Sequence, residues 1–242
     1  MHEIGAGVAA RPRLKLRPAE QRGRARLDWL DSRHTFSFGG YWDPDHVGFR
    51  SLRVVNDDQV EPGHGFGSHP HDNMEILSVV VSGALEHRDS LGTGSVILPG
   101  EVQRMSAGTG ILHSERNPSR SEPVHFLQIW IEPERRGLAP GYEQRRFDET
   151  PDRLVVVACR DGRDGALTVH QDVVVLRGRL NDGGCVSYPL AVGRHAWLQV
   201  IEGAVEVNGV QLAAGDGGST SEAGVLELRG QGGADLLLFD LA

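Results

Sequence analysis

The segment ILSVVVSGALEH (Ile76–His87) decides the fold, because AWLQVIEGAVEV (Ala196–Val207) repeats its design later in the chain. Each segment begins with an apolar, β-rich run, continues with a dipeptide that ends in glycine (Ser82-Gly83 or Glu202-Gly203), and ends with a second, alternating run. This pattern is typical of two strands joined by a tight turn. The match extends to LPGE (Leu98–Glu101) and AAGD (Ala213–Asp216). The repeat predicts two copies of one β-domain.

Short β-rich runs alternate with turn signals along the whole chain, which has 32 glycines among its 242 residues. No stretch shows convincing helical periodicity, and Asn208-Gly209 predicts a β-hairpin. The sequence therefore predicts an all-β fold of two packed sandwich or barrel domains. We expect the division at residues 1–148 and 149–242, where ETPDR interrupts the pattern. The clearest strands are expected at residues 74–81, 197–201, 204–207 and 234–241.

Composition narrows the function classes. The chain is 39% hydrophobic and 24% charged, as in soluble globular proteins, and its net charge of −8 argues against direct nucleic-acid binding. No apolar run is long enough for a membrane helix, and the N-terminus lacks the apolar core of a signal peptide, so we expect a cytoplasmic protein. Cys159 and Cys185 are expected to be buried thiols, and the basic residues 11–26 a solvated edge strand and loop.

Two short clusters carry ligand-type side chains: His69 and His71 in GFGSHPHDNME, and His113 and Glu115 in GTGILHSERN. On a strand, residues i and i+2 point to the same face, so two such strands side by side would direct three imidazoles and one carboxylate into one space. This donor set suits a divalent transition metal. Four protein ligands leave two positions of an octahedral ion for a substrate oxygen and water or dioxygen.

Other ionisable residues of this region are expected in supporting positions. Glu75, four residues after His71, shares the parity of the histidines and is expected to face inward as a fifth group. His64, His87 and His125 are expected near the site or on the surface, not as ligands. The chain has no G-x-S-x-G elbow, P-loop or dinucleotide fingerprint, so nothing in it suggests hydrolase or nucleotide-binding chemistry.

The repeat provides an internal control for the metal site. Aligning Gly83 with Gly203, and Gly100 with Gly215, shows which residues of the second copy stand opposite the four ligand positions. In the order His69, His71, His113 and Glu115, these are Pro189, Ala191, Leu228 and Gly230. None of them binds metal, so the chemistry is expected in the N-terminal half and the second copy is expected to be structural.

The motifs resemble a known family. G-x5-H-x-H-x3-E, from Gly63 to Glu75, is similar to the first cupin motif. GTGILHSE, with PGEVQRMSAG before it, resembles the signature of the pirin family within the cupins. The similarity continues from WLDSRHTFSFGGYWDPDHVGFRSLRVVNDD to LLLFDL, over nearly the whole chain, and is specific to bacterial pirin-like quercetin 2,3-dioxygenases.

This resemblance implies a bicupin fold with a metal-free C-terminal domain. It implies one metal ion held by His69, His71, His113 and Glu115, with Fe(II) as the first choice and Cu(II), Ni(II), Mn(II), Co(II) or Zn(II) as alternatives. Glu75 is then a neighbour of the site and not a ligand. Our leading hypothesis is therefore the opening of flavonols such as quercetin by dioxygen, with release of carbon monoxide and with Glu115 as the catalytic base.

Two other functions are compatible with the same residues. One is a pirin-like regulatory protein, in which the redox state of bound iron switches a surface that binds protein partners. The other is a different cupin reaction, such as isomerisation or decarboxylation, since a fold alone does not fix the chemistry. The leading hypothesis takes an aromatic substrate and dioxygen as partners, with no membrane and no nucleic acid.

Overall fold

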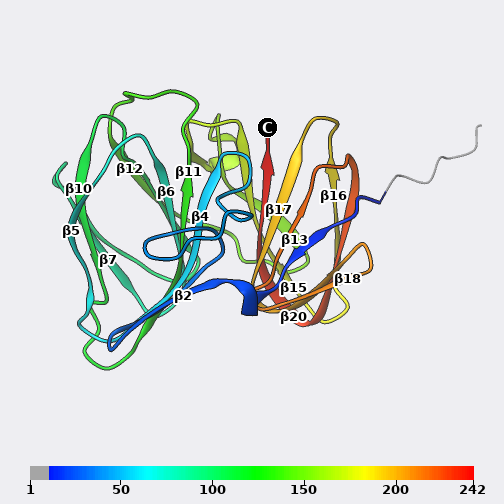
Figure 1. The fold of residues 1–242 in the computed structure, drawn as a ribbon, viewed down its shortest axis with the longest axis horizontal. Coiled ribbons are helices and arrows are strands. Elements are labelled where there is room, and N and C mark those ends of the chain that lie inside the picture. Colours follow the sequence, from blue (N-terminus) through cyan, green and yellow to red (C-terminus); the bar gives the residue numbers. More distant parts are fainter. Residues whose placement is uncertain (1–10) are drawn as a thin grey trace, which may run out of the picture.

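Two β-domains lie side by side in the computed structural model, which describes residues 11–242 (Figure 1). Within this part of the chain the only helical elements are two 3-10 turns, η1 (Ala19–Gln21) and η2 (Arg163–Gly165). The prediction of an all-β bicupin fold is therefore confirmed. No helix of the described residues is long and apolar enough to cross a membrane. The cytoplasmic location stays a prediction.

The N-terminal half consists of two antiparallel sheets whose inner faces are in contact. One sheet contains, in this order, β12 (Gly141–Arg146), β9 (Glu101–Ser106), β6 (Glu75–Ser82), β11 (Val124–Ile131), β4 (Leu52–Val60), β3 (Leu30–His34) and β2 (Gly23–Leu27). The other contains β5 (Gly65–His71), β10 (Ile111–Arg116), β7 (Leu85–Asp89) and β8 (Gly94–Ile97). Side chains of both sheets, including Val80 and Leu85, pack in one buried cluster between them.

The C-terminal half is built around two long strands, β17 (His195–Val207) and β20 (Gly224–Leu241). Its sheet contains, in order, β1 (Lys15–Arg17), β19 (Gly217–Thr220), β17, β20, β15 (Val173–Leu180), β13 (Arg153–Cys159) and β14 (Leu167–Thr168). Two further strands pair with the long ones: β16 (Cys185–Leu190) with β20, and β18 (Val210–Ala213) with β17. The predicted break between residues 201 and 204 is wrong. The strand continues there through register shifts on either side of Gly203, since a bulge bends a strand without ending it.

The aligned glycines of the repeat share one backbone conformation. Gly83 and Gly203 have φ values of 77° and 70°, a region that side-chain-bearing residues rarely adopt. A Cβ atom would also press on the carbonyl oxygen of Pro123 in the first copy and of Gly233 in the second. Both copies thus require glycine at the corresponding position, which lies between two strands in the first copy and at a bulge within β17 in the second. The predicted Asn208-Gly209 hairpin is confirmed between β17 and β18.

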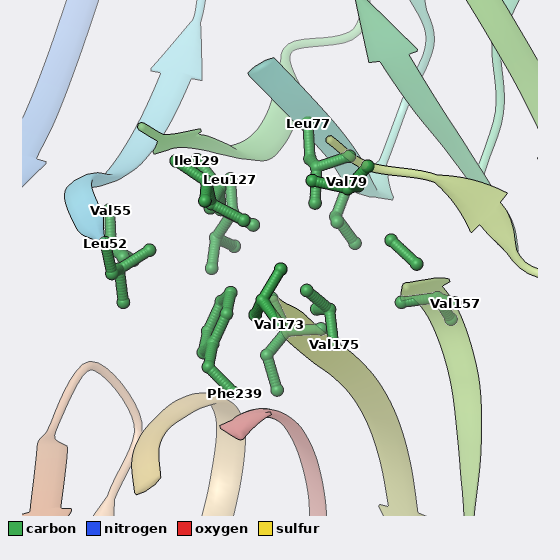
Figure 2. Packing of buried hydrophobic residues seen from close by; sticks show 14 of the residues in the cluster. Leu52, Val55, Leu77, Val79, Leu127, Ile129, Val157, Val173, Val175 and Phe239 are labelled. Atoms are coloured by element: carbon green, nitrogen blue, oxygen red, sulfur yellow. The ribbon is translucent and has the colours of Figure 1, made fainter. Parts of the chain in front are cut away.

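A shared hydrophobic core joins the two halves (Figure 2). The outer face of the seven-stranded sheet contributes buried aliphatic side chains to it, and the C-terminal sheet contributes the opposing layer. The residues labelled in Figure 2 are Leu52, Val55, Leu77, Val79, Leu127 and Ile129 from the first half and Val157, Val173, Val175 and Phe239 from the second. The halves therefore pack as one structural unit.

The N-terminal strand crosses between the halves. β1 pairs with β19, so residues 15–17 extend the C-terminal sheet, and Figure 1 shows this blue strand beside that half. It is the edge strand that the sequence predicts, but Arg17 is buried and bonds to Tyr41 and Asp43.

The division at residue 148/149 falls between β12 and β13 and stays a prediction. Cys159 is a buried free thiol as expected, whereas Cys185 is exposed.

Candidate metal centre

Three of the predicted ligands meet where β5 and β10 pair. His113 stands opposite His69 in the register, and His71 lies two residues further along β5. One ring nitrogen of each histidine lies within 4.8 Å of those of the other two. Pro70 separates the two β5 histidines, and β5 is an edge strand, where a residue without an N–H is tolerated. The i, i+2 spacing thus brings three imidazoles together.

The ring nitrogens of these histidines are available to a metal. His69 Nδ1 lies 2.7 Å from the carbonyl oxygen of Gly67, which favours the tautomer whose Nε2 carries a free lone pair. His113 is buried, and neither of its ring nitrogens has a hydrogen-bond partner among residues 11–242. Burial, followed by repulsion from His69, lowers the pKa of His113 to about 2 and that of His71 to about 4. Both rings are therefore neutral at pH 7, the form that binds metal.

Glu115 is the carboxylate beside this cluster, and its orientation is fixed by three donors. Its Oε1 accepts hydrogen bonds from Ser78 Oγ at 3.1 Å and Gln103 Nε2 at 3.3 Å, and its Oε2 accepts one from Gln128 Nε2 at 2.5 Å. Burial raises the pKa of Glu115. Glu115 lies with His113 and His87 in a second group whose ligand atoms are within 4.8 Å of one another.

His87 is a buried neighbour of Glu115, in the first of the two locations expected for it. It is fully buried, stands opposite Glu115 in the β7–β10 register, and its Nε2 lies 3.0 Å from Asp89 Oδ2. Its ring stacks on Tyr142, with centroids 4.8 Å apart. His87 and Asp89 have the same i, i+2 spacing as His69 and His71, so this signal was present in the sequence.

Glu75 does not face this centre, which corrects the expectation drawn from its parity with His71. A turn containing Asn73 at φ 47° separates β5 from β6, and β6 belongs to the other sheet. The Glu75 carboxylate accepts a hydrogen bond from Ser106 Oγ at 2.8 Å and lies 3.2 Å from His170 Nδ1 of the C-terminal half. Side-chain parity holds only within one continuous strand, and here the strand ends.

Two other histidines that were expected near the site or on the surface, His64 and His125, are not part of the cluster. His64 stacks on Trp29, and His125 Nε2 lies 2.7 Å from Asp57 Oδ1. Neither occurs in the groups of close ligand atoms found among the described residues.

A polar row crosses the inner face of the seven-stranded sheet. Small apolar clusters lie on either side of it, and on β6 Ser78 lies between Ile76 and Val80. In cross-strand register the row runs through His34, Asn56, Gln128, Ser78 and Gln103. The last three of these residues hold Glu115, so this half of the row supports the carboxylate.

A cavity of about 210 Å³ adjoins the centre and is lined in part by His69, His71 and Glu115. Phe38, Phe66 and Trp130 provide aromatic walls. Trp130 also lies edge-on to His71, with ring centroids 4.8 Å apart. A larger surface hollow of about 630 Å³ over the β7–β8 hairpin does not reach the histidines. The arrangement can hold a flat ring beside a metal ion.

Comparison with known proteins identifies the family. Residues 15–131 match the Pirin family model, and residues 156–241 match the model described as the quercetinase C-terminal cupin domain. The quercetin 2,3-dioxygenase of Escherichia coli K12 is 47% identical over 226 residues, which cover 93% of this chain and 97% of that protein. The chain belongs to the pirin family. The extent of this similarity supports an enzymatic role for this pirin.

Solved structures agree with this assignment. The bacterial pirin YhhW from Escherichia coli in complex with nickel(II) is 46% identical, with a TM-score of 0.91 and coverage of 95% of this pirin and 99% of that chain. A quercetin 2,3-dioxygenase from Acinetobacter baumannii, 22% identical with a TM-score of 0.76 and covering 96% of this chain and 87% of its own, shows the shared fold. The neutral imidazoles and the nickel-bound relative together support a divalent metal.

In the second domain of this pirin, aliphatic side chains occupy the positions that correspond to polar residues in the first. In the repeat alignment Leu198 stands opposite Ser78, and Leu228 stands opposite His113. Both leucines are buried in an aliphatic cluster that fills this half, together with Leu226, Leu236 and Leu238. Packed aliphatic side chains hold no metal, so the second copy has replaced the site with a hydrophobic core.

Proposed function

We propose that this pirin is a metal-dependent dioxygenase that opens flavonols such as quercetin and releases carbon monoxide. The observation that carries the proposal is the position of the histidine cluster and Glu115 at the wall of an aromatic-lined cavity. The similarity to a protein named quercetin 2,3-dioxygenase supports the choice of substrate.

His69, His71, His113 and Glu115 would hold the metal, with Fe(II) as our first choice. The two unpartnered nitrogens of buried His113 fit this role, because an imidazole in a dry site without a hydrogen bond or a metal is unfavourable. When bound, the ion supplies Lewis acidity that stabilises a substrate oxyanion and, if redox-active, the capacity to react with dioxygen.

Glu115 is proposed as the base that takes the proton of the flavonol hydroxyl. Ser78, Gln103 and Gln128 fix its direction, so that the oxygen receiving the proton does not rotate away from the substrate.

The aromatic walls would orient the flat substrate and exclude water. Phe38 lies edge-on to Trp130, with ring centroids 5.4 Å apart, and both side chains line the cavity. The indole Nε1 of Trp130 is buried and has no partner in the described part of the chain. This N–H is available to a carbonyl oxygen of the substrate.

The test is turnover of quercetin by the purified protein loaded with Fe(II), and in parallel with Cu(II) or Ni(II), in air. Loss of the flavonol absorbance together with release of carbon monoxide is expected. His113→Ala should abolish both, while His195→Ala, a histidine substitution in the C-terminal half, should leave them unchanged. An intact flavonol with every metal would overturn the proposal. Metal binding without turnover would instead favour the regulatory alternative.

A further inference from the structure

The polar row has a second half in which several buried polar atoms are unpaired in the described residues. Beyond Gln128 it continues to Asn56 on β4 and His34 on β3, and Ser32 and Asp58 form the next cross-strand pair of the same two strands. All four side chains line the cavity beside the metal ligands, and each is at most 4% exposed. They are therefore polar groups taken out of water at the wall of the site.

Three atoms of this group lack any hydrogen-bond partner within residues 11–242: His34 Nδ1, Asn56 Oδ1 and Asp58 Oδ1. His34 Nε2 lies 2.9 Å from Ser32 Oγ. With the Nε2 proton donated to this hydroxyl, His34 Nδ1 carries a lone pair. Burial lowers the pKa of His34, so the ring is neutral at pH 7. All three unpartnered atoms are then hydrogen-bond acceptors.

Unpartnered buried polar atoms are rare in folded proteins, and three on one cavity wall indicate groups that a bound molecule completes. In the other half of the row, Ser78, Gln103 and Gln128 donate to Glu115, and Gln103 Oε1 is the one atom of these three side chains found unpartnered within residues 11–242. A set of acceptors requires a ligand that offers donors. Beside aromatic walls, this ligand is a flat ring carrying hydroxyl groups.

We propose that Asp58, Asn56 and His34 bind hydroxyl groups on the substrate ring that is remote from the reacting hydroxyl, and so select polyhydroxylated aromatic substrates. This inference rests on the proposed function, since it assigns further groups to the same cavity. Asp58 contributes most in the metal-loaded protein, because the nearby cation favours its ionised form and a hydrogen bond to a charged carboxylate is stronger than one to a neutral acceptor. The three residues position the substrate and take no part in the chemistry.

The experiment compares the binding of two ligands under argon, where dioxygen cannot consume them. The ligands are quercetin and a flavonol without hydroxyls on its pendant ring, titrated into the metal-loaded protein by fluorescence quenching. Wild type should bind quercetin about tenfold more tightly than the analogue, the ratio expected for one charge-assisted hydrogen bond. Asp58→Asn should reduce this ratio to about two, mainly by weakening quercetin binding.

Asp57→Asn is the matched control. It makes the same change one residue away, on the other face of β4, where Asp57 bonds to Arg22 and His125. Its selectivity ratio should equal that of wild type. Asn56→Ala is a second variant for the case that Asp58→Asn does not fold, and it should also lower the ratio.

An unchanged ratio in folded Asp58→Asn, or equal binding of both ligands by wild type, would overturn the inference and assign the acceptors to bound water. The absence of binding of either flavonol would overturn it as well. If wild type keeps the tenfold ratio but releases no carbon monoxide in air, the proposed function fails and the inference stands.

Discussion

Replacing Asp58 with asparagine should stabilise the metal-free protein at high pH and leave its stability unchanged at low pH. Burial raises the pKa of Asp58 from 3.8 to about 7. Asparagine has nearly the same shape and does not ionise, so the variant removes the penalty of a buried carboxylate without opening a cavity.

The size and sign of the effect follow from proton linkage. Well below pH 4 Asp58 is protonated in both the folded and the unfolded state, so its full contribution to stability is present. As the pH rises from about 4 to 7, the unfolded chain loses this proton and the folded chain keeps it, and stability falls. With a shift of about three units at 1.36 kcal/mol each, the loss at pH 8 is about 4 kcal/mol. Asp58→Asn should recover this amount.

The assay is urea unfolding of chelator-treated protein between pH 4 and pH 9. The difference in the free energy of unfolding between variant and wild type should grow from near zero to about 4 kcal/mol. In metal-loaded protein the gain should be smaller, because a nearby cation favours the ionised carboxylate. Asp57→Asn should lower the free energy of unfolding at neutral pH, the opposite of the effect of Asp58→Asn. Although burial raises the pKa of Asp57, His125 and Arg22 lower it overall. Equal stability of Asp58→Asn and wild type at pH 8 would refute the reasoning.

Three further predictions concern the site. Gln128→Leu removes the donor to Glu115 Oε2 and should lower metal affinity roughly tenfold or more in a chelator competition, whereas a wild-type affinity would show that this support is dispensable. Trp130→Ala removes an aromatic wall and should raise KM for a flavonol more than it lowers kcat, and an unchanged KM would show that the indole does not contact substrate. Glu75→Gln should keep its metal and activity while losing about 1 kcal/mol of stability in urea unfolding, and a loss of metal would place Glu75 back in the site.

The features predicted correctly from the sequence depend on short-range periodicity. The repeat around Gly83 and Gly203 is a local pattern of two β-rich runs on either side of a glycine, and it predicted the two β-domains. The i, i+2 spacing of His69 and His71 determines which face of one strand they share. Such signals survive in the sequence because they involve neighbouring residues.

The features that sequence reasoning missed depend on pairing between distant strands. Glu75 was misplaced because the turn at Asn73 moves the chain to another sheet. The polar row through Asn56, Gln128 and Ser78 exists only in the register of three strands, and none of its members is unusual in its own segment. The pairing of β1 with β19 is also non-local. Register of this kind is decided by tertiary packing.

The central claim is a single metal ion held by the histidine cluster and Glu115, and metal content per chain tests it most directly. The protein is reconstituted with Fe(II) under argon, desalted and measured by mass spectrometry of the metal and by protein concentration. We expect one ion per chain for wild type and His195→Ala, and less than about a tenth of an ion for His113→Ala. Full occupancy in His113→Ala, or none in wild type, would contradict it.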